Sequence, residues 1–205
     1  MILVLLAVVA PRPAVAGDTP LSGFEGHPRS RFPLTVWAQS SGDAQLDATV
    51  RRAVDDWNAL CREALGLDAF AAGAARELAR VRIHLEPATT AGLMGFTHLR
   101  ADDTGIIEPP VSITVVEPTA RGQTSRETLL YQVVAHELGH ALGLPHVRDP
   151  RSLMCCEPGA VDFNDPVVRE VYVEARRHPD LSSVRAQLVG HYARFGHRCQ
   201  TRPAE

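Results

Sequence analysis

Residues 136–146 read His-Glu-Leu-Gly-His-Ala-Leu-Gly-Leu-Pro-His, and no other stretch restricts the possible fold as strongly. Histidines four positions apart lie on one face of a helix, because an α-helix completes a turn about every 3.6 residues. The imidazoles of His136 and His140 can therefore reach one metal ion, with Glu137 beside them. Gly143 lets the chain leave the helix, since a residue without Cβ accepts the left-handed conformation that ends helices. The turn after it brings His146 to the same point as a third nitrogen ligand.

This ligand set predicts a catalytic zinc ion. Three protein ligands leave a tetrahedral Zn²⁺ with one open position, whereas structural zinc sites are closed by four. The spacing is also a motif of zinc peptidases. A capping box formed by Thr124 and Glu127 predicts where the helix begins. Apolar residues then recur along it with helical periodicity, at Leu129, Leu130, Val133, Val134, Leu138 and Leu142.

The motif resembles the metzincin family of zinc endopeptidases, and its matrixin (matrix-metalloprotease-like) branch in particular. Ser152-Leu153-Met154 follows the third histidine at the distance of the methionine turn of that branch. The resemblance implies that Met154 lies beneath the metal. Two positions depart from the pattern. Val147 stands where matrixins usually have Ser or Thr, and Cys156 stands where astacin and serralysin relatives have a tyrosine, so no tyrosine ligand is expected.

The remaining patterns predict an α+β fold. We expect a mixed, twisted sheet of four to five strands, a long backing helix, the zinc-binding helix and a helical C-terminal part. Alternating apolar residues predict strands over residues 32–38, 81–85, 94–99 and 111–116. Helical periodicity predicts the long helix over residues 43–64, with Trp57 in the core, and residues 65–80 predict a loop with a short helical turn. Further helices are expected from Asp165-Pro166 to about Arg177 and after a cap at Ser182 or Ser183.

The resemblance also implies where a substrate binds. In metzincins the sheet edge nearest the zinc helix holds the substrate as an added strand, and the matching residues are Gly95, Phe96 and Thr97. Backbone hydrogen bonds from such an edge bind extended peptides with little regard for sequence.

The loop that follows this strand is rich in acidic residues. Its potential ligands are His98, Asp102, Asp103 and Glu108. We interpret it as a solvated acidic loop, with a calcium site as the alternative. His178, His191 and His197 have no ligand spacing, and we expect them on the surface.

The N-terminus is typical of an exported protein. Residues 2–10 are all apolar and are followed by Ala14-Val15-Ala16, a small-residue cleavage site. The run is shorter than the ~20 apolar residues that a membrane span needs. We therefore predict a signal peptide over residues 1–16, no membrane span, and a secreted or periplasmic location. A buried N-terminal strand is the alternative.

The rest of the chain suits one catalytic domain. Residues 17–31 are predicted to be an irregular leader, and residues 32–205 the domain itself. Its upper part ends at residue 143, and residues 144–205 form its lower part. The oligomeric state stays open, with a monomer as the working assumption.

Four cysteines bear on the choice of compartment. A bond between the neighbours Cys155 and Cys156 would strain the peptide between them, so we expect each to pair elsewhere. In an exported protein, bridges to Cys61 and Cys199 are expected, in either pairing. Four free thiols are the alternative.

These patterns predict a secreted zinc endopeptidase that acts on proteins or peptides. The metal would activate water, with Glu137 as general base. The net charge of −3 gives no reason to expect nucleic acid as a partner. Two alternatives are a catalytically inactive zinc-binding module and a structural surface protein. Glu137, which adds nothing to metal binding, speaks against the first, and the open coordination position speaks against the second.

Overall fold

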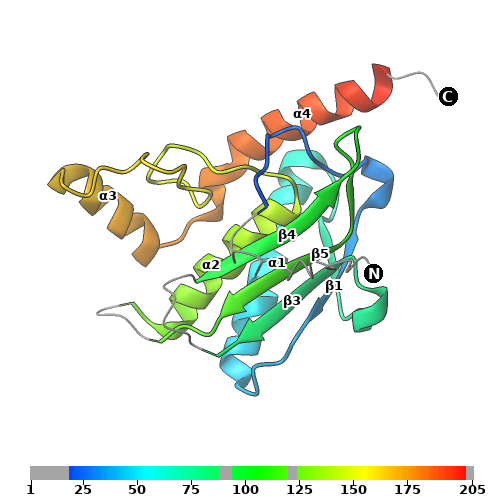
Figure 1. The fold of residues 1–205 in the computed structure, drawn as a ribbon. Coiled ribbons are helices and arrows are strands. Elements are labelled where there is room, and N and C mark those ends of the chain that lie inside the picture. Colours follow the sequence, from blue (N-terminus) through cyan, green and yellow to red (C-terminus); the bar gives the residue numbers. More distant parts are fainter. Residues whose placement is uncertain (1–18, 88–93, 120–123, 202–205) are drawn as a thin grey trace, which may run out of the picture.

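The computed structural model describes residues 19–87, 94–119 and 124–201, with side chains up to residue 196 (Figure 1). The predicted signal peptide therefore lies outside the described residues. The strands are β1 (Leu34–Ala38), β2 (Phe70–Ala72), β3 (Val81–Glu86), β4 (Gly95–Ala101) and β5 (Ile107–Val116). The helices are α1 (Ala44–Leu65), α2 (Arg126–Ala141), α3 (Pro166–Arg177) and α4 (Arg185–Thr201).

The five strands form one sheet in the order β2-β1-β3-β5-β4. All neighbours are parallel except β4, which runs antiparallel to β5 at the edge of the sheet. The expected α+β fold with a mixed sheet is confirmed. The short edge strand β2 falls in residues predicted to be a loop, because a three-residue strand is too short to show alternation.

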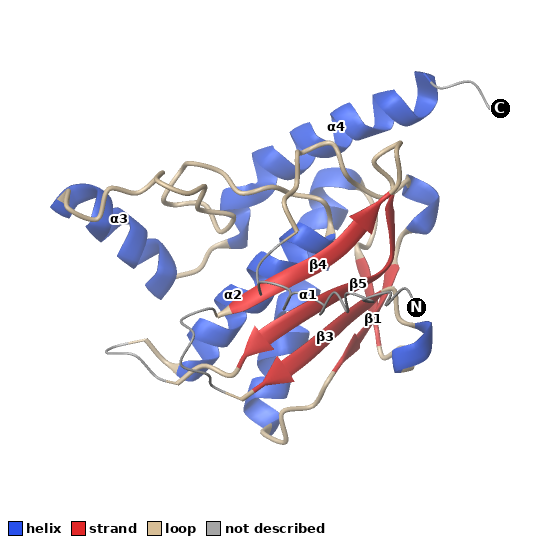
Figure 2. Cartoon of the chain, viewed as in Figure 1, coloured by secondary structure: helices blue, strands red, loops and turns tan. Residues whose placement is uncertain are grey.

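Helices α1 and α2 pack together on one face of the sheet (Figure 2). Asp43 caps α1 by accepting hydrogen bonds from two backbone N–H groups of its first turn, and the helix ends at Gly66, which is left-handed. Trp57 is fully buried, as predicted, and its indole N–H donates to the Ala135 carbonyl oxygen at 2.9 Å. This bond ties the long helix to the helix of the histidine motif.

The start of α2 differs by one residue from the prediction. Ser125, not Thr124, is the cap, and its hydroxyl oxygen accepts a bond from the Thr128 N–H at 3.1 Å. Most of the helix is buried, because α1, β4 and β5 all pack against it.

The lower part is mainly helical. Helix α3 has the predicted start and end, with Asp165 as its cap. Asp180, rather than Ser182 or Ser183, caps the short helical turn that leads into α4. His178 is exposed as expected, whereas the expectation for His191 is wrong.

His191 is buried against Tyr192 and Phe195 on α4, with 1% of its surface exposed. The lack of ligand spacing indicates only that a histidine is not in a local metal motif. It does not indicate which face of a helix another segment covers. The side chain of His197 lies outside the described residues.

The segment before β1 is anchored at the end of α2. His27 donates a hydrogen bond from Nε2 to the Ala141 carbonyl oxygen at 2.9 Å, because a carbonyl can only accept. Burial lowers the pKa of His27 to about 4, so the ring is neutral at pH 7. Gly143 has φ of 89°, and a Cβ there would lie 2.3 Å from the Glu25 carbonyl oxygen. Glycine is thus required both for the turn and for the close approach of this segment.

Among the described residues, no helix is both long enough and apolar enough to cross a bilayer.

Candidate metal centre

The three histidines of the motif converge on one point. The Nε2 atoms of His136, His140 and His146 lie 3.1 Å from one another in all three pairs. Zn–N bonds of about 2.0–2.1 Å in tetrahedral geometry would separate such nitrogens by about 3.3 Å. Within the described ranges, these residues form the one cluster of three or more potential ligands that could hold a metal.

Backbone carbonyls orient two of the rings. Nδ1 of His136 lies 2.7 Å from the Leu153 oxygen, and Nδ1 of His140 lies 2.8 Å from the Leu144 oxygen. Since a carbonyl only accepts, each Nδ1 carries the proton and each Nε2 points its lone pair at the shared centre.

The ring of His136 is held neutral. Burial lowers its pKa well below the usual range, and the neighbouring His140 lowers it further. Neutral imidazoles with lone pairs facing one another repel unless a cation lies between them. The donor set therefore fits a Zn²⁺ ion.

The side chain of Glu137 projects from α2 towards the edge strand β4. Only 3% of its surface is exposed. Its Oε2 accepts a hydrogen bond from the Thr97 hydroxyl at 2.7 Å. The carboxylate thus contacts the predicted substrate strand, and Glu137 directly follows His136 on α2.

Met154 packs beneath the motif helix. It is completely buried, and a Cβ added to Gly139 would lie 2.4 Å from its sulfur. Gly139 lies on α2 three residues after His136 and directly before His140. The methionine turn therefore packs against the part of the helix that carries the first two histidines. The Val147 N–H donates to the Met154 carbonyl oxygen at 3.0 Å and fixes the turn next to the third histidine.

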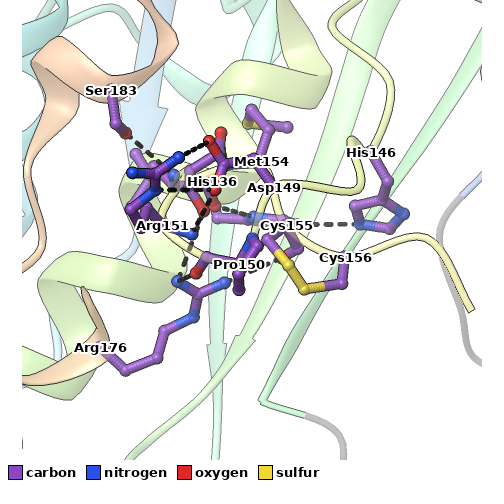
Figure 3. The surroundings of a disulfide bond; sticks show 12 residues. His136, His146, Asp149, Pro150, Arg151, Met154, Cys155, Cys156, Arg176 and Ser183 are labelled. Atoms are coloured by element: carbon purple, nitrogen blue, oxygen red, sulfur yellow. Dashed lines mark hydrogen bonds and ion pairs between the residues drawn. A yellow bond between two sulfur atoms is a disulfide. The ribbon is translucent and has the colours of Figure 1, made fainter. Parts of the chain in front are cut away.

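The predicted cysteine pairing is wrong, both for Cys155 and Cys156, which were expected to pair elsewhere, and for Cys61. Cys155 and Cys156 are bonded to each other, and Cys61 is a free, buried thiol (Figure 3). Cys61 faces the core from α1, where burial raises its pKa to about 12. Cys61 follows Trp57 by one helical turn on the buried face of α1, so its side chain packs in the core instead of forming a cross-link. The side chain of Cys199 lies outside the described residues.

The disulfide lies beside His146 in a loop that α3 holds in place (Figure 3). Arg176 on α3 donates to the carbonyl oxygens of Pro150, Ser152 and Cys155 at 3.2–3.4 Å. The disulfide thus lies close in the fold to the third histidine, because Cys155 also pairs with Val147.

The predicted substrate residues lie on β4, the outermost strand on the α2 side of the sheet. The segment beginning at Thr19 already contacts this edge. The Thr19 N–H donates to the Thr97 carbonyl oxygen at 2.9 Å, and the Thr19 hydroxyl exchanges bonds with the N–H and carbonyl of Leu99. A pocket bordered by His140 and His146 has this segment as its opposite wall.

The acidic loop has local hydrogen bonds of its own. Asp102 accepts bonds from the backbone N–H groups of Thr104 and Ile106. The Thr104 hydroxyl is the main cause of the lowered pKa of Asp102. His98 packs its ring against Phe96. The solvated loop stays the prediction here, with calcium binding as its alternative.

A comparison with protein families matches the matrixin family over residues 33–160, which includes the sheet, the motif and the methionine turn. The chain belongs to the matrixin family. Matrixins are zinc metalloproteases, so the family and the geometry of the histidines agree. Macrophage metalloelastase of Oryctolagus cuniculus is 51% identical over 37 residues. That stretch is 18% of this chain and 8% of the metalloelastase, so the similarity covers far less than two thirds of that relative's length.

One contact of this matrixin was missed by sequence reasoning. Thr97 was singled out for its backbone alone, yet its side chain reaches Glu137. The sequence pattern of the strand did contain a signal for this contact. Thr97 shares the inward face of β4 with Leu99, and a polar residue on a buried face needs a hydrogen-bonding partner.

Proposed function

We propose that this matrixin is a secreted zinc-dependent endopeptidase. One observation carries the proposal: the Nε2 atoms of three histidines converge at 3.1 Å within the stretch matched to the family, and the buried Glu137 directly follows the first of them in the sequence. Secretion rests on the pattern of residues 1–16 alone.

The residues divide the chemistry between them. His136, His140 and His146 would hold the ion. Bound zinc would supply Lewis-acid chemistry that makes water a nucleophile near neutral pH and polarises a carbonyl. Glu137 would take a proton from the attacking water and pass it to the nitrogen of the leaving amine.

Digestion of casein with the purified chain tests this function. We expect cleavage that stops with 1,10-phenanthroline, continues with the non-chelating 1,7 isomer, and returns when zinc is added back. If a zinc-loaded, folded chain leaves both casein and gelatin intact, the inactive zinc-binding module becomes the better interpretation.

The substrate would bind in extended form along β4, next to Gly95, Phe96 and Thr97. Backbone groups at this edge offer the hydrogen bonds that add a strand. A peptide that pairs with Thr97 and Leu99 would have to displace Thr19, which now uses the same groups.

Thr19→Ala is therefore expected to lower KM for a peptide substrate by roughly fivefold, since a net hydrogen bond contributes about 1 kcal/mol. Peptide hydrolysis measured over a range of substrate concentrations checks this. Thr35→Ala is the matched control, because its hydroxyl bonds to Leu78 instead. A higher KM in Thr19→Ala would mean that Thr19 assists substrate binding.

A further inference from the structure

Thr97 and Glu137 form a buried contact between the edge strand and the motif helix. Thr97 is 1% exposed, and its hydroxyl lies 2.7 Å from Oε2 and 3.2 Å from the carbonyl oxygen of Glu137. A hydroxyl has one proton to donate. The shorter distance and the negative charge direct that proton to the carboxylate, because charge-assisted bonds are shorter and stronger.

Gly95 shapes the other side of this contact. It lies two positions before Thr97 and therefore on the same face of β4. A Cβ at Gly95 would lie 2.5 Å from Cγ1 of Val133 and 3.1 Å from Oε1 of Glu137. Real Cβ atoms do not approach a neighbour as closely as 2.5 Å, so glycine here lets α2 come close to the strand.

Together the two residues limit the positions of the Glu137 side chain. Gly95 provides space for one carboxylate oxygen, and Thr97 holds the other by a hydrogen bond. Threonine suits this task because its branched Cβ restricts the rotation of its side chain. Catalytic groups need such support, since small displacements cost large factors in rate.

We propose that Thr97 is a positioning residue, which holds the carboxylate of Glu137 in the orientation that proton transfer requires. The inference rests on the proposed peptidase function. It adds that one strand has two roles: its backbone binds the substrate, and its Thr97 side chain orients the general base.

Thr97→Val and Thr97→Ser test this role in the zinc-loaded enzyme. Valine keeps the shape and removes the hydroxyl, and we expect kcat to fall by roughly tenfold, as for a lost bond to a charged group. KM and zinc content should stay within about twofold of the wild type, because the backbone edge and the histidines are unchanged. Thr97→Ser, which keeps a hydroxyl, should restore most of kcat.

Thr114→Val on the adjacent strand is the matched control. Thr114 is also buried, but it pairs with Phe96 through its backbone. The Thr114→Val variant should have the same kcat as the wild type. A purely structural role for Thr97 would change the melting temperature without changing kcat per folded, zinc-loaded molecule. An unchanged kcat in Thr97→Val would overturn the proposal.

A second measurement needs no activity and uses metal-free protein. In the wild-type background, Thr97→Val should lower the melting temperature by several degrees. In a chain that already carries Glu137→Ala, the same substitution should lower it by less than half as much. Equal losses in the two backgrounds would show that no bond joins the residues. If the wild type cleaves nothing while this coupling is present, the peptidase function fails and the Thr97–Glu137 contact stands as a structural bond alone.

Discussion

Glu137→Ala is expected to lose peptide cleavage by about 10²–10⁴-fold, the range typical of a missing general base. The loss should appear in kcat, because the carboxylate acts on the attacking water and the leaving nitrogen rather than on substrate binding. Zinc should stay bound, since the three Nε2 atoms meet without any contribution from this residue.

Purified Glu137→Ala would be assayed on a peptide substrate, with zinc measured by elemental analysis and folding by thermal melting. Glu157→Ala is a suitable control, because Glu157 borders the pocket beside His140 and His146 but lies partly exposed, outside the motif. Near-normal cleavage by Glu137→Ala would assign the general base to another residue.

Alanine at His136, His140 or His146 is expected to abolish stoichiometric zinc binding. Loss of a partner that merely orients a metal ligand already weakens metal binding by about 10–100-fold, so loss of a ligand itself should cost more. We expect one zinc per chain in the wild type, far less in each variant, and no measurable cleavage of casein by any of them.

His178→Ala provides the histidine control. Its side chain is 76% exposed at the end of α3, away from the cluster, so zinc content and activity should not change. Full zinc in His146→Ala would remove that residue from the ligand set. Loss of zinc in His178→Ala would instead indicate a general effect of histidine substitution on folding.

Local spacing is sufficient to predict the features that depend on one turn of helix or on one strand. The cluster of His136, His140 and His146 follows from the helical period and from the turn at Gly143. The burial of Trp57 follows from the same period. These are short-range properties, because the backbone geometry of a single element places its own side chains.

Contacts between distant segments were decided by tertiary structure. The bond from Thr97 to Glu137 joins residues 40 positions apart, and that from His27 to Ala141 joins residues 114 apart. Periodicity indicates which face of an element is covered, but not which partner covers it. This is why the burial of His191 and the free thiol of Cys61 were predicted wrongly.

The sequence by itself therefore determined the metal-binding motif and the order of the main elements and predicted the class of chemistry, since each depends on spacing within a few residues. Only the tertiary structure decided how the site is supported. It placed Met154 against Gly139, the Thr97 hydroxyl on Glu137 and Thr19 along the edge strand β4. The physical reason is that packing of α2 against both α1 and the sheet selects these partners, and packing depends on shape and distance that no local pattern records.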